Sequence, residues 1–158
     1  MIPTTDAQNP RPARSPVVAF IAEEHRDALD LVALGVRGNL GLAALFTGDT
    51  DAAERAFREE LMLCRELVVL PIAFEGLRGL AAIAAVHGDG QRAAALLRAV
   101  AAHRYGERTD ALDARFEAAF FEAALARHGA QAWSAAFRDG GVLTFAEAIA
   151  YALEQARS

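Results

Sequence analysis

The sequence predicts an all-α domain. Apolar residues recur at helical spacing through most of the chain, strand patterns are nearly absent, and glycines separate the helical stretches. The chain has 158 residues, of which 54% are apolar and 23% charged, a composition typical of one soluble domain. The one β-like run, Leu67 to Leu70, abuts Pro71, so we assign it to a helix end and a connection.

The N-terminal segment differs from the rest of the chain. Four of the five prolines lie in the first sixteen residues, among Thr, Asn, Gln and Asp. This composition cannot bury an apolar face, so we expect residues 1–15 to form a disordered tail. Ser15 as the N-cap and Pro16 at the first helical position indicate where helix begins. The predicted helical domain therefore spans residues 16–158.

A Gly-Asp pair recurs in the same setting. Gly48-Asp49 and Gly88-Asp89 each follow an apolar helical run and lie 40 residues apart. Each pair precedes a predicted amphipathic helix, from Asp51 to about Glu66 and from Gln91 to about Tyr105. One or two helices come before the first pair, depending on a break near Gly35. The recurrence predicts an internal repeat of antiparallel helical hairpins.

Capping boxes predict where two helices begin. Asp51 with Glu54 fits the pattern at the start of the helix after the first Gly-Asp pair, and Thr144 with Glu147 fits it before the last helix. The helix after the second pair lacks such a box, because Gly90 occupies the cap region.

Two further helices are predicted between the helix that follows Gly88-Asp89 and the last helix of the chain. Asp110 and Asp113 indicate the start of a helix that runs to about His128 and is terminated by Gly129. A short helix follows from Ala130 to Arg138. The predicted apolar face of the longer helix comprises Phe116, Ala119, Phe120, Ala123 and Ala124.

The two hairpins resemble tetratricopeptide repeats. In that pattern a small residue on the first helix lets the hairpin close, and a bulky residue from the second helix fills the notch. The resemblance implies a short right-handed solenoid of stacked antiparallel hairpins with C-terminal capping helices. Its residues are Leu40, Gly41, Ala44, Gly48, Ala53 and Phe57 in the first repeat, and Leu80, Ala81, Ala84, Gly88, Ala93 and Leu97 in the second.

Over about three quarters of its length, from Gly38 to Leu153, the chain resembles the C-terminal helical-repeat end of large bacterial LuxR-type and SARP-type transcriptional regulators, which carry an ATPase module. That resemblance implies a protein-interaction role in transcriptional regulation or signalling. The sequence contains no phosphate-binding Gly-x-x-x-x-Gly-Lys-Ser/Thr segment and no basic helix-turn-helix. The segments that carry the resemblance to these regulators are Asn39-Leu40-Gly41, Gly48-Asp49, Leu77, Leu80-Ala81, Gly88-Asp89, Arg92-Ala93-Ala94, Phe137, Leu143-Thr144, Glu147-Ala148 and Ala152-Leu153.

Charge and composition exclude several classes of partner. The net charge is −5 and the calculated pI is near 5.4, which argues against direct nucleic-acid binding. The apolar run from Val17 to Ala22 is too short for a signal core, so we expect neither a signal peptide nor a transmembrane helix, and a cytoplasmic protein. Cys64, the single cysteine, is interpreted as a small buried hydrophobe.

Catalysis and metal binding lack their usual residue patterns. The four histidines are not at metal-ligand spacing, and there is no Gly-x-Ser-x-Gly, His-Glu-x-x-His or Cys-x-x-Cys motif. We therefore expect no enzyme activity, no metal and no cofactor.

The predicted binding site is an apolar groove lined by the first helix of each hairpin. An apolar peptide or a partner helix is expected to dock there, unless the final helix of the chain or a second copy covers the groove; with only two full repeats, a homodimer is one way to cap the stack. The residues assigned to this groove are Leu42, Leu45, Phe46, Glu75, Arg78, Ala82 and Val86.

Two alternatives remain open at this stage. One is a small-molecule sensor with a pocket between the repeats and the C-terminal helices, near Arg104, Tyr105 and Trp133. The other is a homo-oligomeric structural unit without a foreign partner.

Overall fold

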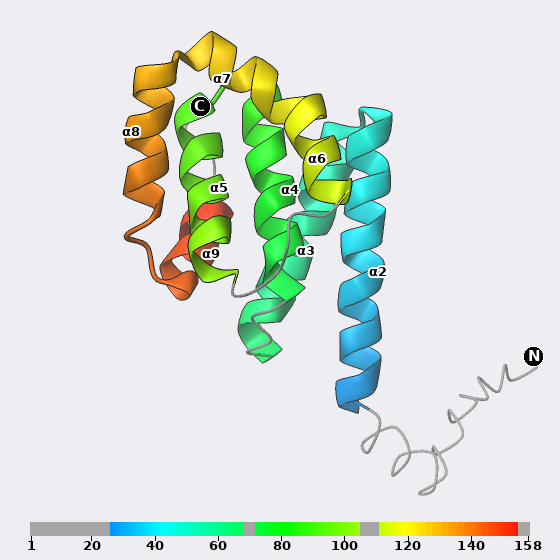
Figure 1. The fold of residues 1–158 in the computed structure, drawn as a ribbon. Coiled ribbons are helices and arrows are strands. Elements are labelled where there is room, and N and C mark those ends of the chain that lie inside the picture. The colour runs from blue at the N-terminus through cyan, green and yellow to red at the C-terminus, as the bar shows by residue number, and fades with distance from the viewer. Residues whose placement is uncertain (1–25, 68–71, 105–110, 155–158) are drawn as a thin grey trace, which may run out of the picture. The chain divides into compact units, whose positions relative to one another are not determined.

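The computed structural model describes residues 26–67, 72–104 and 111–154. It contains two compact units, Met1–Val32 and Ala33–Ser158. Within the described ranges every regular element is a helix, and the helices pack as antiparallel pairs, so the prediction of an all-α protein is confirmed (Figure 1). The predicted tail over residues 1–15 and the helix start at Pro16 lie outside the described residues.

The described part of the chain forms seven helices, one of which contains a π-helical turn. The first, α2, continues through Gly35 without a break and crosses the boundary between the two units. The elements are α2 (Arg26–Thr47), α3 (Thr50–Leu67), α4 (Ala73–Val86), α5 (Gly90–His103), the continuous α6 (Ala111–Phe116), η2 (Glu117–Phe121) and α7 (Glu122–His128), then α8 (Ala130–Gly140) and α9 (Phe145–Leu153).

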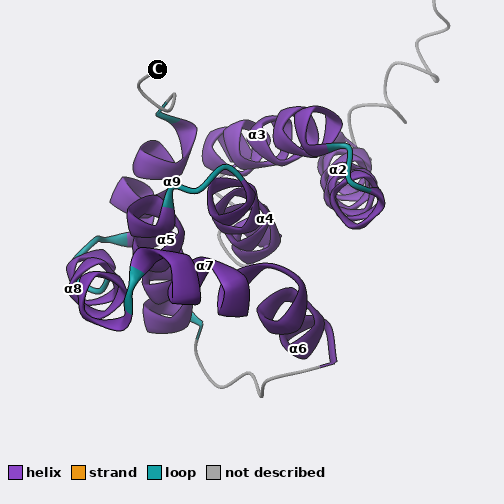
Figure 2. Ribbon diagram, turned by 90° about the horizontal axis from the view of Figure 1, so that it is seen from above, coloured by secondary structure: helices purple, strands orange, loops and turns teal. Residues whose placement is uncertain are grey.

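Helix α4 is the centre of the second unit. Helices α3, α5 and α9 and the turn η2 all pack against it (Figure 2). Its residues from Gly76 to Ala85 are buried without interruption, which explains why this segment reads as apolar on every side. The hydrophobic core of the unit therefore surrounds α4.

The two Gly-Asp turns have the same geometry. Gly48 and Gly88 have φ angles of +88° and +84°, a region that glycine enters without steric cost. The side chains of Asp49 and Asp89 each accept a 3.0 Å hydrogen bond from the backbone N–H three residues on, at Ala52 and Arg92. These aspartates are therefore the N-caps of the following helices.

This finding corrects two predictions about helix starts. The capping box assigned to Asp51 and Glu54 is wrong, because Asp51 already lies inside α3 and Glu54 instead accepts a hydrogen bond from Arg58. The helix after the second pair has no capping box, as predicted, but its N-cap is Asp89 and not Gly90. The predicted Thr144–Glu147 capping box of α9 is confirmed, with both reciprocal hydrogen bonds present.

The ring of Phe57 joins three helices. It is fully buried, and a Cβ added at Gly41 of α2 would lie 2.6 Å from its Cε1 atom. A Cβ added at Gly79 of α4 would overlap the opposite edge of the same ring. The ring therefore occupies a slot between α2 and α4 that exists only because both facing positions are glycine.

The helix over residues 111–128 has a shifted inner face. A π-helical turn takes one extra residue, and in η2 the N–H of Glu122 donates to the carbonyl of Glu117. The inward position after Phe116 consequently falls on Phe121. The predicted face is wrong at Ala119 and Ala123, which are exposed, whereas Phe116, Phe121 and Ala124 are buried and Phe120 is half-buried.

Helix α2 is unusually apolar for a helix at the surface. By length and composition alone, its segment Ala28–Thr47 is apolar enough to cross a membrane, a test that the core helix of a soluble protein also passes. The absence of a transmembrane helix, which the sequence predicts, stays a prediction. In the first unit α2 exposes Leu29, Leu31 and Val32, and in the second it exposes Val36 and Leu40. The cytoplasmic location stays a prediction.

Replacing Phe57 by alanine tests the three-helix slot. Phe57→Ala is expected to lower the free energy of unfolding by about 3 to 5 kcal/mol, because the cavity lies between helices that cannot collapse around it. Chemical denaturation followed by circular dichroism measures this change. Val142→Ala, at a side chain that is 82% exposed, is the control and should change stability by less than about 0.5 kcal/mol. Equal stability of both variants would show that the slot does not hold the helices.

Candidate functional site

The structure places the predicted groove residues in three different environments. Leu45 and Ala82 are fully buried core residues, so neither is available to a partner of the folded chain. Leu42, Phe46 and Glu75 are partly buried, Arg78 is buried, and Val86 is exposed. Leu40, which belongs to the repeat pattern of the first hairpin, is itself 60% exposed.

The helix over residues 111–128 covers much of this face. The Phe46 ring meets the rings of Phe116 and Phe120 at centroid distances of 5.4 Å each, and the guanidinium of Arg115 lies 4.7 Å from the Phe46 ring centroid. The sequence analysis considered the final helix as the cover, but α9 packs on α3, α4 and α5 instead. The expected groove is therefore occupied at Phe46 by another helix of the chain.

An ion-paired cluster fixes α6 on α4. Asp113 pairs with Arg78, and its two carboxylate oxygens also lie 2.9 and 2.8 Å from the Nη1 atom of Arg104. All three side chains are less than one-fifth exposed. The guanidinium of Arg78 also stacks 4.6 Å from the centroid of the Phe116 ring. These contacts connect α4, the C-terminal cap of α5 and α6.

A cavity of about 300 Å³ opens beside this cluster. Its lining includes both the ion-paired side chains and several apolar side chains. Arg104, which was predicted to belong to a ligand pocket, is part of its lining, whereas Trp133 packs on the core from α8 and Tyr105 lies outside the described residues. The lining comprises Arg78, Leu97, Val100, Ala101, Arg104, Asp113, Phe116, Glu117 and Phe121.

Two carboxyl groups that interact with each other lie on α3 and α4. Glu60 of α3 is only 1% exposed, and neither of its side-chain oxygens has a hydrogen-bond partner. The Oε1 atom of Glu75 is likewise buried without a partner. Buried polar groups are nearly always paired, so this pair is exceptional within the described part of the chain.

Burial changes the protonation of these groups. Removal from water, together with the nearby charge of Glu75, raises the pKa of Glu60 to about 8. Burial also raises the pKa of Glu75, and Arg78 partly opposes this effect. The thiol of Cys64 has its pKa raised to about 12 by burial and by Glu60, which agrees with its interpretation as an unreactive buried residue.

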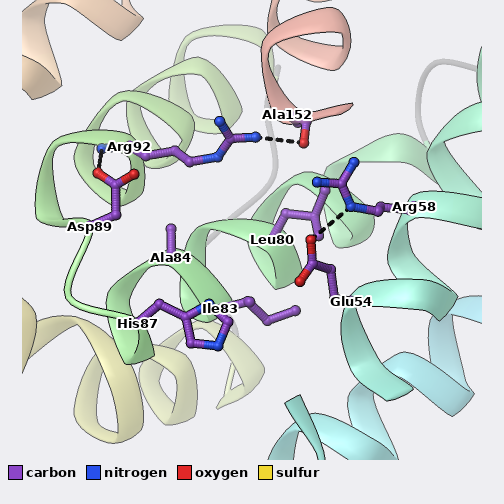
Figure 3. Close-up of a pocket in the computed structure, with 9 residues that line it drawn as sticks. All are labelled: Glu54, Arg58, Leu80, Ile83, Ala84, His87, Asp89, Arg92 and Ala152. Carbon is purple, nitrogen blue, oxygen red and sulfur yellow. Dashed lines mark hydrogen bonds and ion pairs between the residues drawn. The ribbon is translucent and has the colours of Figure 1, made fainter. Parts of the chain in front are cut away.

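A smaller pocket lies where α3, α4, α5 and α9 meet (Figure 3). Two of its arginines hold the C-terminal end of α9. Arg58 donates to the carbonyl of Leu153 at 2.8 Å, and Arg92 donates to those of Tyr151 and Ala152 at 2.9 and 2.8 Å. Cationic side chains at a helix C-terminus satisfy carbonyls that lack partners within the helix. We therefore interpret these two arginines as structural residues that hold α9 in place.

The described residues offer no further chemical site. Among them, no three His, Cys, Asp or Glu side chains lie together in a way that would hold a metal ion. The Nε2 atom of His103 donates a 2.7 Å hydrogen bond to the carbonyl of Leu143, and the side chain of His128 packs against Gly90. Both histidines therefore serve contacts between helices.

Comparisons with family models, with curated proteins and with solved structures found no match.

Sequence reasoning missed the most unusual residue, Glu60. It follows Glu59 and precedes an apolar pair, a setting that is usual for the solvent-facing side of an amphipathic helix. Its position relative to the buried Phe57 and Cys64, three residues before and four residues after it, was the available signal. Arg58 and Arg92 carried no signal, because their acceptors are backbone carbonyls far along the chain.

Removal of the Asp113 carboxylate tests the ion-paired cluster. Asp113→Ala is expected to lower the free energy of unfolding by about 3 to 5 kcal/mol, because two buried guanidinium groups lose the same partner. Urea denaturation measures this change, and Asp139→Ala, at an exposed position on α8, is the matched control. If Asp113→Ala unfolds at the same urea concentration as the wild type, the cluster does not hold α6 in place.

Proposed function

We propose that the chain is a protein-interaction module of the tetratricopeptide type that binds its partner through the outer face of α2. The observation that supports this proposal is the exposure of Val36 and Leu40, at 51% and 60%, one helical turn apart. Leu34 and Leu45 on the other side of the same helix are buried. Neighbouring apolar side chains exposed on one face are typical of contact surfaces.

The covered groove favours this outer face over the inner one. A partner in the predicted groove would have to displace the rings of Phe116 and Phe120 from Phe46. The outer face of residues 33–47 requires no such rearrangement. A helix with an apolar stripe would pack along it in the usual helix-to-helix manner.

Two structural features support the tetratricopeptide type. The Gly48-Asp49 and Gly88-Asp89 turns share their geometry, and Gly129, 41 residues after Gly88, has the same positive φ of 88°. The Phe57 ring fills a notch at Gly41, as the repeat pattern requires. The sequence resemblance to bacterial regulators supports a partner from a transcriptional or signalling complex.

Ligand binding is the second candidate function. It is favoured by the cavity of about 300 Å³, whose lining includes the ion-paired Arg78 and Arg104 and the rings of Phe116 and Phe121. Such a lining suits a small molecule with an apolar body and a polar group.

A capture experiment with three baits tests the interaction. We expect wild-type protein and Val142→Asp to retain the same partner from native bacterial extract, and Leu40→Asp to lose it, because an aspartate at Leu40 places a charge in the middle of the apolar contact. Mass spectrometry identifies the partner, and the mass of the complex in solution shows whether it is a second copy of the chain.

Both substitutions replace an exposed apolar residue by aspartate, so the circular dichroism spectra should match that of the wild type. Equal retention on the Leu40→Asp bait, or no retention on any bait, contradicts the proposal. If no bait retains a partner, a rise in melting temperature with small molecules would favour ligand binding in the cavity as the function.

A further inference from the structure

The carboxyl group of Glu60 lies where α2, α3 and α4 meet. A Cβ added at Gly38 of α2 would lie 3.0 Å from its Oε1 atom, and one added at Gly76 of α4 would lie 3.1 Å from its Oε2 atom. Both neighbouring helices therefore present bare backbone to the carboxyl group. Neither glycine supplies a side chain that would pair with it.

The charged groups around Glu60 do not neutralise it. From α4 it faces Glu75, and Arg78 one turn further along α4 is paired with Asp113. On α2, Arg37 pairs with the neighbouring Glu59, at 3.5 Å between Nε and Oε2. On α3 itself, Glu60 interacts with the buried thiol of Cys64 and raises the pKa of that thiol. Residues 68–71, which follow α3, contribute no titratable side chain.

We propose that Glu60 is a proton-dependent latch that holds residues 33–47 of α2 against α3 and α4. In its neutral form the carboxyl group fits between the two glycines. When it gives its proton to solvent, the carboxylate requires water. Helix α4 is enclosed by α3, α5, α9 and η2, so α2 is the neighbour that separates to admit water.

The latch has a defined pH range. Burial and Glu75 raise the pKa of Glu60 from 4.5 to about 8, so the packed state binds one proton more than the released state between these pH values. The packed state is therefore fully favoured below pH 4.5 and loses this advantage as pH rises to about 8. Over this range the packing equilibrium changes by up to tenfold per pH unit.

The latch also bears on the proposed function, because Val36 and Leu40 lie on the helix that it holds. In that respect it rests on the proposed function. Its test needs no partner, so that a failure of the latch and a failure of partner binding are seen in separate experiments.

Hydrogen exchange of the purified chain at pH 6 and pH 9 tests the latch. After correction for the intrinsic exchange rate, we expect amide protection in residues 33–47 to fall at least tenfold at pH 9, while protection in α5 and α8 is retained. Glu60→Gln imitates the neutral carboxyl group and should keep α2 protected at both pH values. Glu66→Gln changes an exposed acid of the same helix and should behave like the wild type.

A further variant keeps the test decisive if Glu60→Gln does not fold. Glu75→Gln removes the neighbouring negative charge, which raises the pKa of Glu60 in the wild type. The pH range over which the packed state binds the extra proton becomes narrower, so the loss of α2 protection between pH 6 and pH 9 should be smaller than in the wild type. The latch is overturned if α2 protection does not depend on pH, if all helices lose protection together, or if Glu60→Gln loses α2 protection as the wild type does.

Discussion

The second unit depends on the Phe57 ring, which fits between Gly41 and Gly79. A single aromatic side chain of α3 thereby sets how closely α2 and α4 approach. One helical turn further along, Glu60 occupies the equivalent place between Gly38 and Gly76. The contact between α2, α3 and α4 is therefore filled by an apolar ring at one helical turn and by a buried carboxyl group at the next. The first contact supplies stability through burial, and the second makes the packing of α2 sensitive to protonation.

The central position of α4 is the basis of the binding face that we propose. Its surface is taken up by α3, α5, α9 and η2, and the rings of Phe116 and Phe120 close the side next to Phe46. The ion pairs of Asp113 with Arg78 and Arg104 hold that cover in place. The apolar side chains left uncovered in this unit include Val36 and Leu40 on the outside of α2. This distribution of exposed apolar side chains is the physical basis for proposing a protein partner on α2. A small molecule is the ligand that we propose for the cavity beside the ion-paired cluster.

Local signals in the sequence predicted the helices well and the site less well. The Gly-Asp turns, the end at Gly129 and the Thr144–Glu147 capping box depend on residues within a few positions of each other, and the structure has all three. The inner face of the 111–128 helix was mispredicted because the π-helical turn η2 depends on packing against α4, which no local pattern encodes. The groove prediction failed for a related reason: Leu45 is a buried core residue, and Phe46 is covered by the rings of Phe116 and Phe120, which come much later in the chain. Glu60 was missed because an acidic residue beside Glu59 looks like part of a solvated face.

The central claim is that the chain's own helix closes the face that the repeat pattern would leave open. The most direct test is a photo-crosslink from position 46, with benzoylphenylalanine in place of Phe46, in the purified protein. The account predicts an intramolecular crosslink to residues 111–128, because the rings of Phe116 and Phe120 lie against Phe46. If no crosslink to residues 111–128 forms and the probe instead captures another protein, the groove is open and the interaction belongs to the inner face.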